Sequence, residues 1–204
     1  LTDEGIEIVW VTSGAIASAR ERMKGQARGK SPGNLLAEKQ ALSALGQPIV
    51  MDLYNLSLHA VGRKGAQILL TYDDFKNRER LRNFQNSIEQ LLRWQVVPVL
   101  NENDAVATEE IRFGDNDSLS AKVAKAIDAD LLVILTDVDG LYDRDPKVYR
   151  DARLIDHLGK VTAGDLKSVA DSKHSSAGTG GIFSKLKAAQ EAQTSKIPTL
   201  DRKS

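Results

Sequence analysis

Short runs of consecutive apolar residues alternate along this chain with longer segments that have one apolar face. Runs that are apolar at every position, rather than at every second one, are typical of strands covered on both faces. Strands separated by helices form parallel sheets between helical layers. The pattern therefore predicts one α/β domain over residues 1–204, a three-layer α/β/α sandwich with a mainly parallel central sheet. We expect strands at residues 6–11, 66–70, 96–100, 131–135 and 197–200. We expect helices at residues 15–23, 34–46, 48–62, 73–93, 117–127, 163–170 and 183–194.

Charge and composition exclude several classes of function. The 28 Lys and Arg residues balance 28 Asp and Glu residues, whereas proteins that bind nucleic acid or anionic membranes usually carry a basic excess. We therefore expect no nucleic-acid partner and no membrane partner. The absence of cysteine excludes disulfides and thiolate chemistry, and three dispersed histidines do not predict a zinc site. No residue is assigned as a metal ligand, and we expect a soluble cytoplasmic protein.

Polar residues follow the first and third expected strands, where ligands bind in open α/β sheets. Thr12, Ser13, Gly14 and Ala15 lead from a strand into a helix, whose free N–H groups favour an anion. The alternative is a tight turn with no ligand. After the third strand, Asp104 could hold an ammonium group, with neighbouring asparagines orienting a carboxylate. The alternative there is a solvated turn with an asparagine cap.

Two further loops carry acidic side chains. Asp117 could be the N-cap of a helix, but capping does not explain the adjacent Asp115 and Asn116, which suit a cation, a polar ligand or an exposed turn. Thr136 and Asp137 end the fourth strand, where such residues can contact a nucleotide. The acidic run that follows could take part in magnesium binding, because Mg²⁺ uses few protein ligands, or it could be a solvated loop.

A glycine-containing segment, residues 175–185, runs into the last expected helix as a phosphate-binding loop would. Lys185, one turn into that helix, could reach a phosphate or could be a solvated lysine. The segment is not a Walker A loop, because no glycine precedes Lys185. It is not the dinucleotide-binding motif either, because Phe183 occupies the place of the third glycine.

Taken together, these segments resemble one family. The motifs lie at residues 11–17, 40–47, 74–80, 101–108, 114–117, 135–142 and 178–185. In order and spacing they are similar to the glutamate 5-kinases of the amino acid kinase fold family. The resemblance implies transfer of the γ-phosphoryl group of ATP to the γ-carboxylate of L-glutamate, the first step of proline biosynthesis. It also implies Mg²⁺ with ATP, feedback inhibition by proline, and a homo-oligomer, either a dimer or a tetramer.

The resemblance assigns roles to individual residues. Those implied to bind glutamate are Ser13, Gly14, Ala15, Asp104 and Asn116. Those implied to bind the nucleotide are Thr136, Asp137, Thr179, Gly180, Gly181, Ile182, Phe183, Ser184 and Lys185. Lys185 matches a lysine that contacts the transferring phosphoryl group, and Asp117 matches an acidic residue that organises the catalytic lysines.

The chain departs from the family pattern at both ends. The family's opening strand with Lys-x-Gly-[Ser/Thr] has no counterpart, and neither has the C-terminal RNA-modification-type (PUA) domain of many members. Residues 1–204 are therefore expected to be a single amino acid kinase domain without these parts. Fewer residues than usual separate the last strand from Arg202 and Lys203. Two alternatives remain: a sister kinase with another acceptor, and a non-catalytic remnant that binds glutamate or proline.

Overall fold

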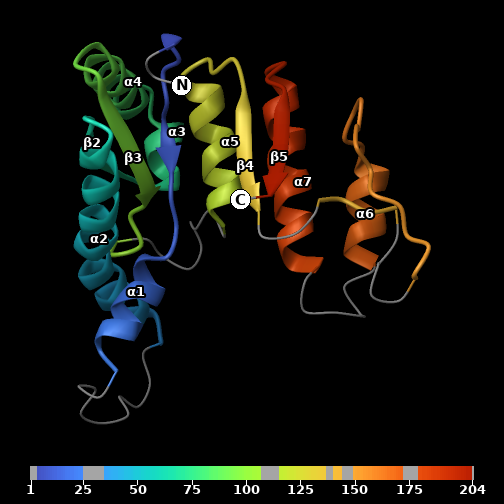
Figure 1. Ribbon diagram of the computed structural model, residues 1–204, viewed down its shortest axis with the longest axis horizontal. Helices are drawn as coiled ribbons and strands as arrows, with labels where there is room; N and C mark the ends of the chain where they lie inside the picture. Colours follow the sequence, from blue (N-terminus) through green and yellow to red (C-terminus); the bar gives the residue numbers. More distant parts are fainter. Residues whose placement is uncertain are drawn as a thin grey trace. The chain divides into compact units, whose positions relative to one another are not determined.

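Parallel strands connected by helices build the whole structure, which confirms the predicted α/β class (Figure 1). We analysed a computed structural model that describes residues 4–24, 35–106, 115–136, 140–143, 149–171 and 179–203. The chain divides into two compact units, Leu1–Asn116 and Asp117–Ser204. Within these described ranges the strands form one parallel sheet in each unit, with three strands in the first and two in the second.

The sheet of the first unit has the strand order β1 (Trp10–Val11), β3 (Val96–Glu102), β2 (Lys64–Leu70). Both pairings are parallel, and Leu100 of β3 lies opposite Val11 on one side and Ile68 on the other. The central strand is buried along almost its whole length, with Leu100 fully buried. Three boundaries differ from the expected ones, because strand length follows pairing. Strand β2 begins at Lys64, opposite Val96, rather than at residue 66. The first strand keeps only the two residues that pair with β3, and β3 extends through Glu102, which pairs with Leu70.

One long helix, α2 (Leu35–Ala60), replaces the two helices expected at residues 34–46 and 48–62. Pro48 lies inside it and cannot donate the usual backbone hydrogen bond, a loss of about 3 kcal/mol in a helix interior. The helix continues because its buried face runs past the proline. That face comprises Leu42, Ser43, Gly46, Gln47, Val50 and Met51. Burial on both sides of the proline offsets the cost of the missing bond.

Gly46 is the point at which α2 meets α1 (Ala15–Arg22). A Cβ atom built on Gly46 would lie 1.8 Å from the carbonyl oxygen of Ala15 and 2.4 Å from its carbonyl carbon. Both of these are backbone atoms, so no side-chain rotation can relieve the overlap. The two helices can therefore cross this closely only with glycine at position 46.

Replacing Gly46 with alanine is expected to destabilise the first unit. Alanine favours a helix over glycine by about 1 kcal/mol, but overpacking against fixed atoms costs about 1–3 kcal/mol. We expect the second effect to win, with a lower free energy of unfolding in urea. Ala44→Gly, at an exposed position of the same helix, measures the propensity effect alone. A Gly46→Ala variant more stable than the unaltered chain would contradict the close contact with Ala15.

The single helix expected at residues 73–93 is two helices, α3 (Tyr72–Lys76) and α4 (Arg78–Arg93). Asn77 separates them, because its side-chain oxygen accepts hydrogen bonds from the N–H groups of Glu79 and Arg80, both at 3.0 Å. An asparagine in this geometry caps a new helix rather than continuing the old one. The expected apolar face of the longer helix is present, with Phe84 and Ile88 buried.

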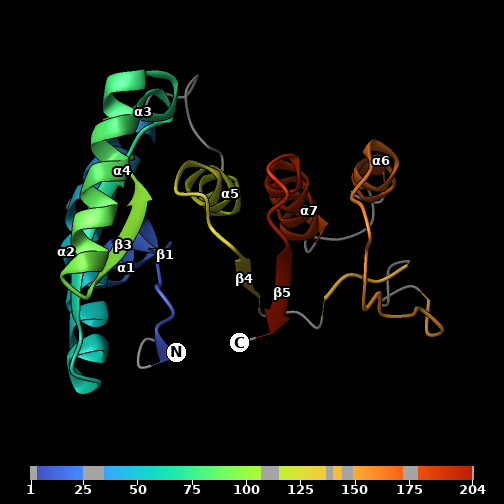
Figure 2. The same ribbon diagram turned by 90° about the horizontal axis from the view of Figure 1, so that it is seen from above.

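The second unit contains α5 (Asn116–Ala126), β4 (Leu132–Thr136), α6 (Ala163–Asp171), α7 (Thr179–Thr194) and β5 (Thr199–Lys203). Strands β4 and β5 are parallel neighbours, and α5 and α7 lie on the same side of them (Figure 2). The core between these elements consists of Ala121, Ala124, Leu132, Ile134, Ala188, Ala192 and Ile197. Small residues on both helices let them pack closely on β4.

Two elements of this unit have boundaries that differ from the expected ones. Helix α7 begins before the expected residue 183, and β5 begins and ends later than the expected range 197–200.

Burial of the strands differs between the units. In β4 the side chains alternate, so Leu132 and Ile134 are buried while Val133 and Leu135 are exposed. The sequence predicts burial on both faces, and this strand shows burial on one.

Among the helices that the structure describes, none is both long and apolar enough to span a bilayer.

Candidate active site

The three strands of the first unit end at one edge of their sheet, since all are parallel. Two backbone hydrogen bonds join the segments that leave this edge. The N–H of Thr12, just after β1, donates to the carbonyl of Leu100 at 2.8 Å, and the N–H of Asn103 donates to that of Leu70 at 2.7 Å. The predicted glutamate-binding residues Ser13 and Asp104 are thus held at the same edge.

The turn after β1 places a left-handed glycine at the start of α1. Gly14 has a φ of 95°, which glycine adopts without strain, and it is the N-cap of α1. The first N–H groups of a helix have no partner within the helix and favour negative charge. Ser13 and Gly14 are exposed, whereas Ala15 is buried against Gly46. A carboxylate could therefore approach the turn from the side of Ser13.

Polar side chains begin within β3 itself rather than after it. Asn101 and Glu102, expected in a loop, are its last two residues and are only 3% and 7% exposed. The side-chain oxygen of Asn101 accepts a hydrogen bond from the N–H of Glu102 at 2.9 Å. Asn103 and Asp104 follow and are half-buried. A fully solvated turn, one of the two interpretations of this segment, does not describe its buried beginning.

A cavity of about 210 Å³ adjoins the turn, between α1 and α2. Its lining consists of Thr12, Ser13, Ser18, Val50, Leu53, Tyr54 and Ser57. Most of these residues carry hydroxyl groups, and Tyr54 and Thr12 are linked directly through theirs at 2.6 Å. The sequence analysis assigns no role to Tyr54. Its position 42 residues from Thr12 explains why no local motif could identify it.

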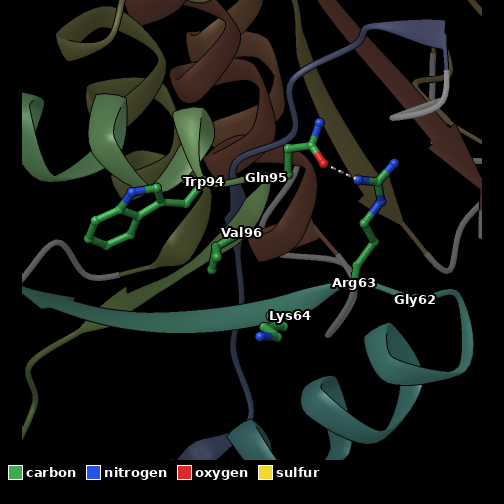
Figure 3. A pocket seen from close by; sticks show the side chains of 6 residues that line it. All are labelled: Gly62, Arg63, Lys64, Trp94, Gln95 and Val96. Carbon is green, nitrogen blue, oxygen red and sulfur yellow. Dashed lines mark hydrogen bonds between the residues drawn. The ribbon is translucent and has the colours of Figure 1, made fainter.

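A second cavity, of about 380 Å³, lies at the opposite end of β2 and β3 (Figure 3). It is lined by Gly62, Arg63, Lys64, Trp94, Gln95 and Val96. Arg63 donates a 3.5 Å hydrogen bond to the side-chain oxygen of Gln95, and the indole of Trp94 points away from Arg63. These residues precede the strands, so the cavity is at the amino end of the sheet. The polar motifs are at its carboxyl end, where α/β sheets bind ligands.

In the second unit, three predicted site residues contact one another. The hydroxyl of Ser184 donates to Oδ2 of Asp117 at 2.7 Å, and Nζ of Lys185 lies 3.4 Å from both carboxylate oxygens. Both members of this ion pair are about four-fifths buried, with 20% of the Lys185 side chain and 22% of the Asp117 side chain exposed. Asp117 thereby fixes the direction of the Lys185 ammonium group. Its expected role as a helix N-cap is wrong, because α5 already begins at Asn116.

The other predicted nucleotide-binding residues fall on β4 and α7. Thr136 is the last residue of β4 and is only 5% exposed. Thr179, Gly180 and Gly181 form the first turn of α7 rather than a loop, and Ile182 and Phe183 are half-buried in the same helix. Asp137 lies outside the described residues. The first turn of α7 therefore presents helix N–H groups at the segment where a phosphate-binding loop was expected.

Asp201 is a further acidic residue near this cluster that the sequence analysis did not single out. Desolvation raises the pKa of its carboxyl group, the charge of Lys185 acts in the opposite direction, and the negative charge of Asp117 adds to the rise. Asp201 lies on β5 opposite Ile134 of β4. No spacing motif connects it with residue 185, so only the pairing of the strands reveals it. Within the described ranges, no group of three or more His, Cys, Asp or Glu residues could hold a metal ion.

Comparison with known proteins identifies the family. The sequence model of the amino acid kinase family matches residues 1–200. The chain therefore belongs to the amino acid kinase family. Relatives named glutamate 5-kinase include one from Caldanaerobacter subterraneus subsp. tengcongensis, 43% identical over 93% of this chain and 50% of the relative. Another, from Geobacter metallireducens, is 46% identical over 98% of this chain and 52% of the relative. A third, from Clostridium acetobutylicum, is 42% identical over 94% of this chain and 70% of the relative.

The chain spans about half the length of the first two relatives. Solved structures share the fold at low sequence identity. Aspartate kinase from Synechocystis is 17% identical with a TM-score of 0.61, over 99% of this chain and 33% of that one. Aspartokinase III from E. coli, in complex with aspartate and ADP, is 18% identical with a TM-score of 0.61, over 92% and 43% of the two chains.

Proposed function

We propose that this chain transfers the γ-phosphoryl group of ATP to the γ-carboxylate of L-glutamate, forming L-glutamyl 5-phosphate. The observation that carries phosphoryl transfer is the Asp117–Lys185 pair, which holds an ammonium group in a fixed direction. The choice of glutamate is supported by relatives at 42–46% identity that are named glutamate 5-kinase. The residues we propose for glutamate are Ser13, Gly14, Ala15, Asp104 and Asn116. Those we propose for the nucleotide are Thr136, Asp137, and Thr179 to Lys185.

The residue types suit this reaction. The acceptor carboxylate has an ordinary pKa of about 4.3 and is ionised at neutral pH, so it needs no general base. The obstacle is the approach of two anions. Lys185 and the N–H groups at the start of α7 would offset the charge that develops on the transferring group. Asp104 would pair with the α-ammonium group of glutamate, which distinguishes a free amino acid from an N-acylated one.

We also propose Mg²⁺ as the companion of ATP. In kinase sites this ion keeps several waters and is held by one or two carboxylates together with the substrate phosphates. When bound, it would neutralise phosphate charge and orient the γ-phosphoryl group. Removing Mg²⁺ with a chelator should therefore abolish turnover.

An acyl-phosphate trap tests the activity. The protein is incubated with ATP, Mg²⁺ and hydroxylamine, and hydroxamate is measured with L-glutamate, L-aspartate and N-acetyl-L-glutamate. Product with glutamate alone supports the proposal. Product with another acid instead indicates a sister kinase. Calorimetric binding of glutamate without any hydroxamate or ADP indicates a sensor and contradicts the proposed reaction. Adding L-proline to the same assay tests the proposed feedback inhibition.

We propose that the protein is a homo-oligomer, a dimer or tetramer, that uses the exposed face of α2. Leu45, Leu53 and Leu56 are 50%, 59% and 73% exposed and lie on one side of the helix. Exposed leucines aligned on one helix face are typical of an association surface.

The cellular location we propose is the cytoplasm, where ATP is available.

Replacing Leu56 with glutamate is expected to reduce the oligomer to a smaller species, because the charge would be desolvated at the interface. Light scattering after size-exclusion chromatography measures the mass. Val61→Glu is the control, since Val61 is 69% exposed but follows the end of α2. An unchanged mass for Leu56→Glu, or an equal loss with Val61→Glu, would exclude this face as the interface.

A further inference from the structure

Tyr54, on α2, reaches across to the turn that the proposed function assigns to glutamate. Its hydroxyl oxygen lies 2.6 Å from Oγ1 of Thr12, a residue that is only 6% exposed. The hydroxyl of Thr12 donates in turn to the carbonyl oxygen of Ser13 at 3.3 Å. A hydroxyl has one hydrogen, so donation to Ser13 leaves its lone pairs to accept the hydrogen of Tyr54. The three groups thus form a hydrogen-bond chain, in which Tyr54 on α2 donates to Thr12 and Thr12 donates to the backbone carbonyl of Ser13.

Two other contacts hold the first two groups of this hydrogen-bond chain. The ring of Tyr54 packs edge-on against Trp10 of β1, with the ring centroids 5.5 Å apart. The N–H of Thr12 donates to the carbonyl of Leu100 in the central strand at 2.8 Å. Tyr54 and Thr12 are therefore both anchored to the sheet, on β1 and β3 respectively. The last group of this hydrogen-bond chain belongs to Ser13, which is exposed and leads directly into Gly14.

We propose that Tyr54 is a positioning residue for the turn of Ser13, Gly14 and Ala15, acting through the hydroxyl of Thr12. It sets the orientation of the Ser13 peptide group and hence of the N–H groups that follow at the start of α1. The role assigned to Tyr54 acts through Thr12 and needs no direct contact with a substrate. This inference rests on the proposed binding of glutamate at the turn, and it assigns the control of glutamate affinity to a residue on a different helix.

The variants separate the hydroxyl from the ring. Tyr54→Phe keeps the contact with Trp10 and removes the hydrogen bond, Thr12→Val removes the other partner, and Thr12→Ser retains it. Ser57→Ala is the matched control, because Ser57 lines the same cavity but its hydroxyl donates to Leu53 of its own helix. If Tyr54 acts through Thr12, the double variant Tyr54→Phe/Thr12→Val should behave like either single variant rather than as their sum.

Two readouts are measured on the whole chain. In the hydroxamate assay, Tyr54→Phe should raise the KM for glutamate by about three- to tenfold, the usual effect of one lost hydrogen bond, while kcat and the KM for ATP change less than about twofold. Thr12→Ser should stay close to the unaltered chain. In amide hydrogen exchange, Tyr54→Phe should speed exchange at Thr12 and at Ser18, whose N–H bonds to Gly14.

The two readouts distinguish failure of this inference from failure of the proposed function. Equal rises in both KM values, additive effects in the double variant, or unchanged KM and unchanged exchange would each overturn the positioning role. Faster exchange in Tyr54→Phe, together with no hydroxamate from the unaltered chain, would support the positioning role and contradict the glutamate kinase activity.

Discussion

Replacing Lys185 with methionine is expected to lower kcat about 100- to 1,000-fold, the usual cost of removing one donor that stabilises transition-state charge. The KM values for ATP and glutamate should change much less, because the ammonium group is needed most when charge builds on the transferring phosphoryl group. Methionine retains the length of the side chain and its packing in α7. Initial rates in the hydroxamate assay, with each substrate varied in turn, measure the effect.

Lys187→Met is the matched control for this prediction. Lys187 is exposed on the same helix, two residues after Lys185, and its loss should leave kcat unchanged. Asp117→Asn adds a second check. It preserves an acceptor for Ser184 but removes the charge that orients Lys185, so kcat should fall by a smaller factor than in Lys185→Met. Equal losses in the two lysine variants would mean that the helix, and not the Lys185 ammonium group, is responsible.

Removing the carboxylate of Asp104 is expected to raise the KM for glutamate by about 30-fold or more, whereas the KM for ATP stays within a factor of about two. Truncating one member of a buried charge pair costs about 2–5 kcal/mol in binding, and each 1.4 kcal/mol corresponds to tenfold. Asp104 is half-buried just after β3, at the edge where Ser13 also lies. The expected partner is the α-ammonium group of the amino acid.

Two substitutions at this position separate charge from packing. Asp104→Asn keeps the size and loses the charge, and Asp104→Ala loses both. If the carboxylate pairs with the ammonium group, the two variants should have similar KM values for glutamate. Asp130→Asn, at an exposed site of the second unit, controls for the change in net charge. Rises of the same size for ATP and for glutamate would remove Asp104 from the substrate role.

The sequence alone was sufficient to predict the α/β class, and local physics explains why. Apolar runs such as residues 96–100 are typical of strands covered by other elements, and the amphipathic segment that contains Phe84 and Ile88 is typical of a surface helix. The family could be inferred from the order of several short motifs, and comparison with known sequences confirms it. The roles of the individual site residues remain predictions.

Element boundaries required the tertiary structure. Gly46 and Pro48 read locally as the end of one helix and the start of another, but burial of a continuous face on both sides keeps α2 intact. Strand β3 gains Asn101 and Glu102 because β2 offers backbone partners for them. Asn77 is the opposite case. Its capping chemistry was present in the sequence, and an apolar pattern that continued beyond it concealed the break.

The sequence determined which residue types are available for binding and catalysis, because a motif sets the chemistry of a few neighbouring positions. Which of them act together was decided only by folding. Asp117 meets Ser184 and Lys185 across 67 and 68 positions, and Tyr54 meets Thr12 across 42. Contacts over such separations arise from the pairing of strands and the crossing of helices. No local pattern encodes them, since the energy that selects them comes from burial of the whole unit.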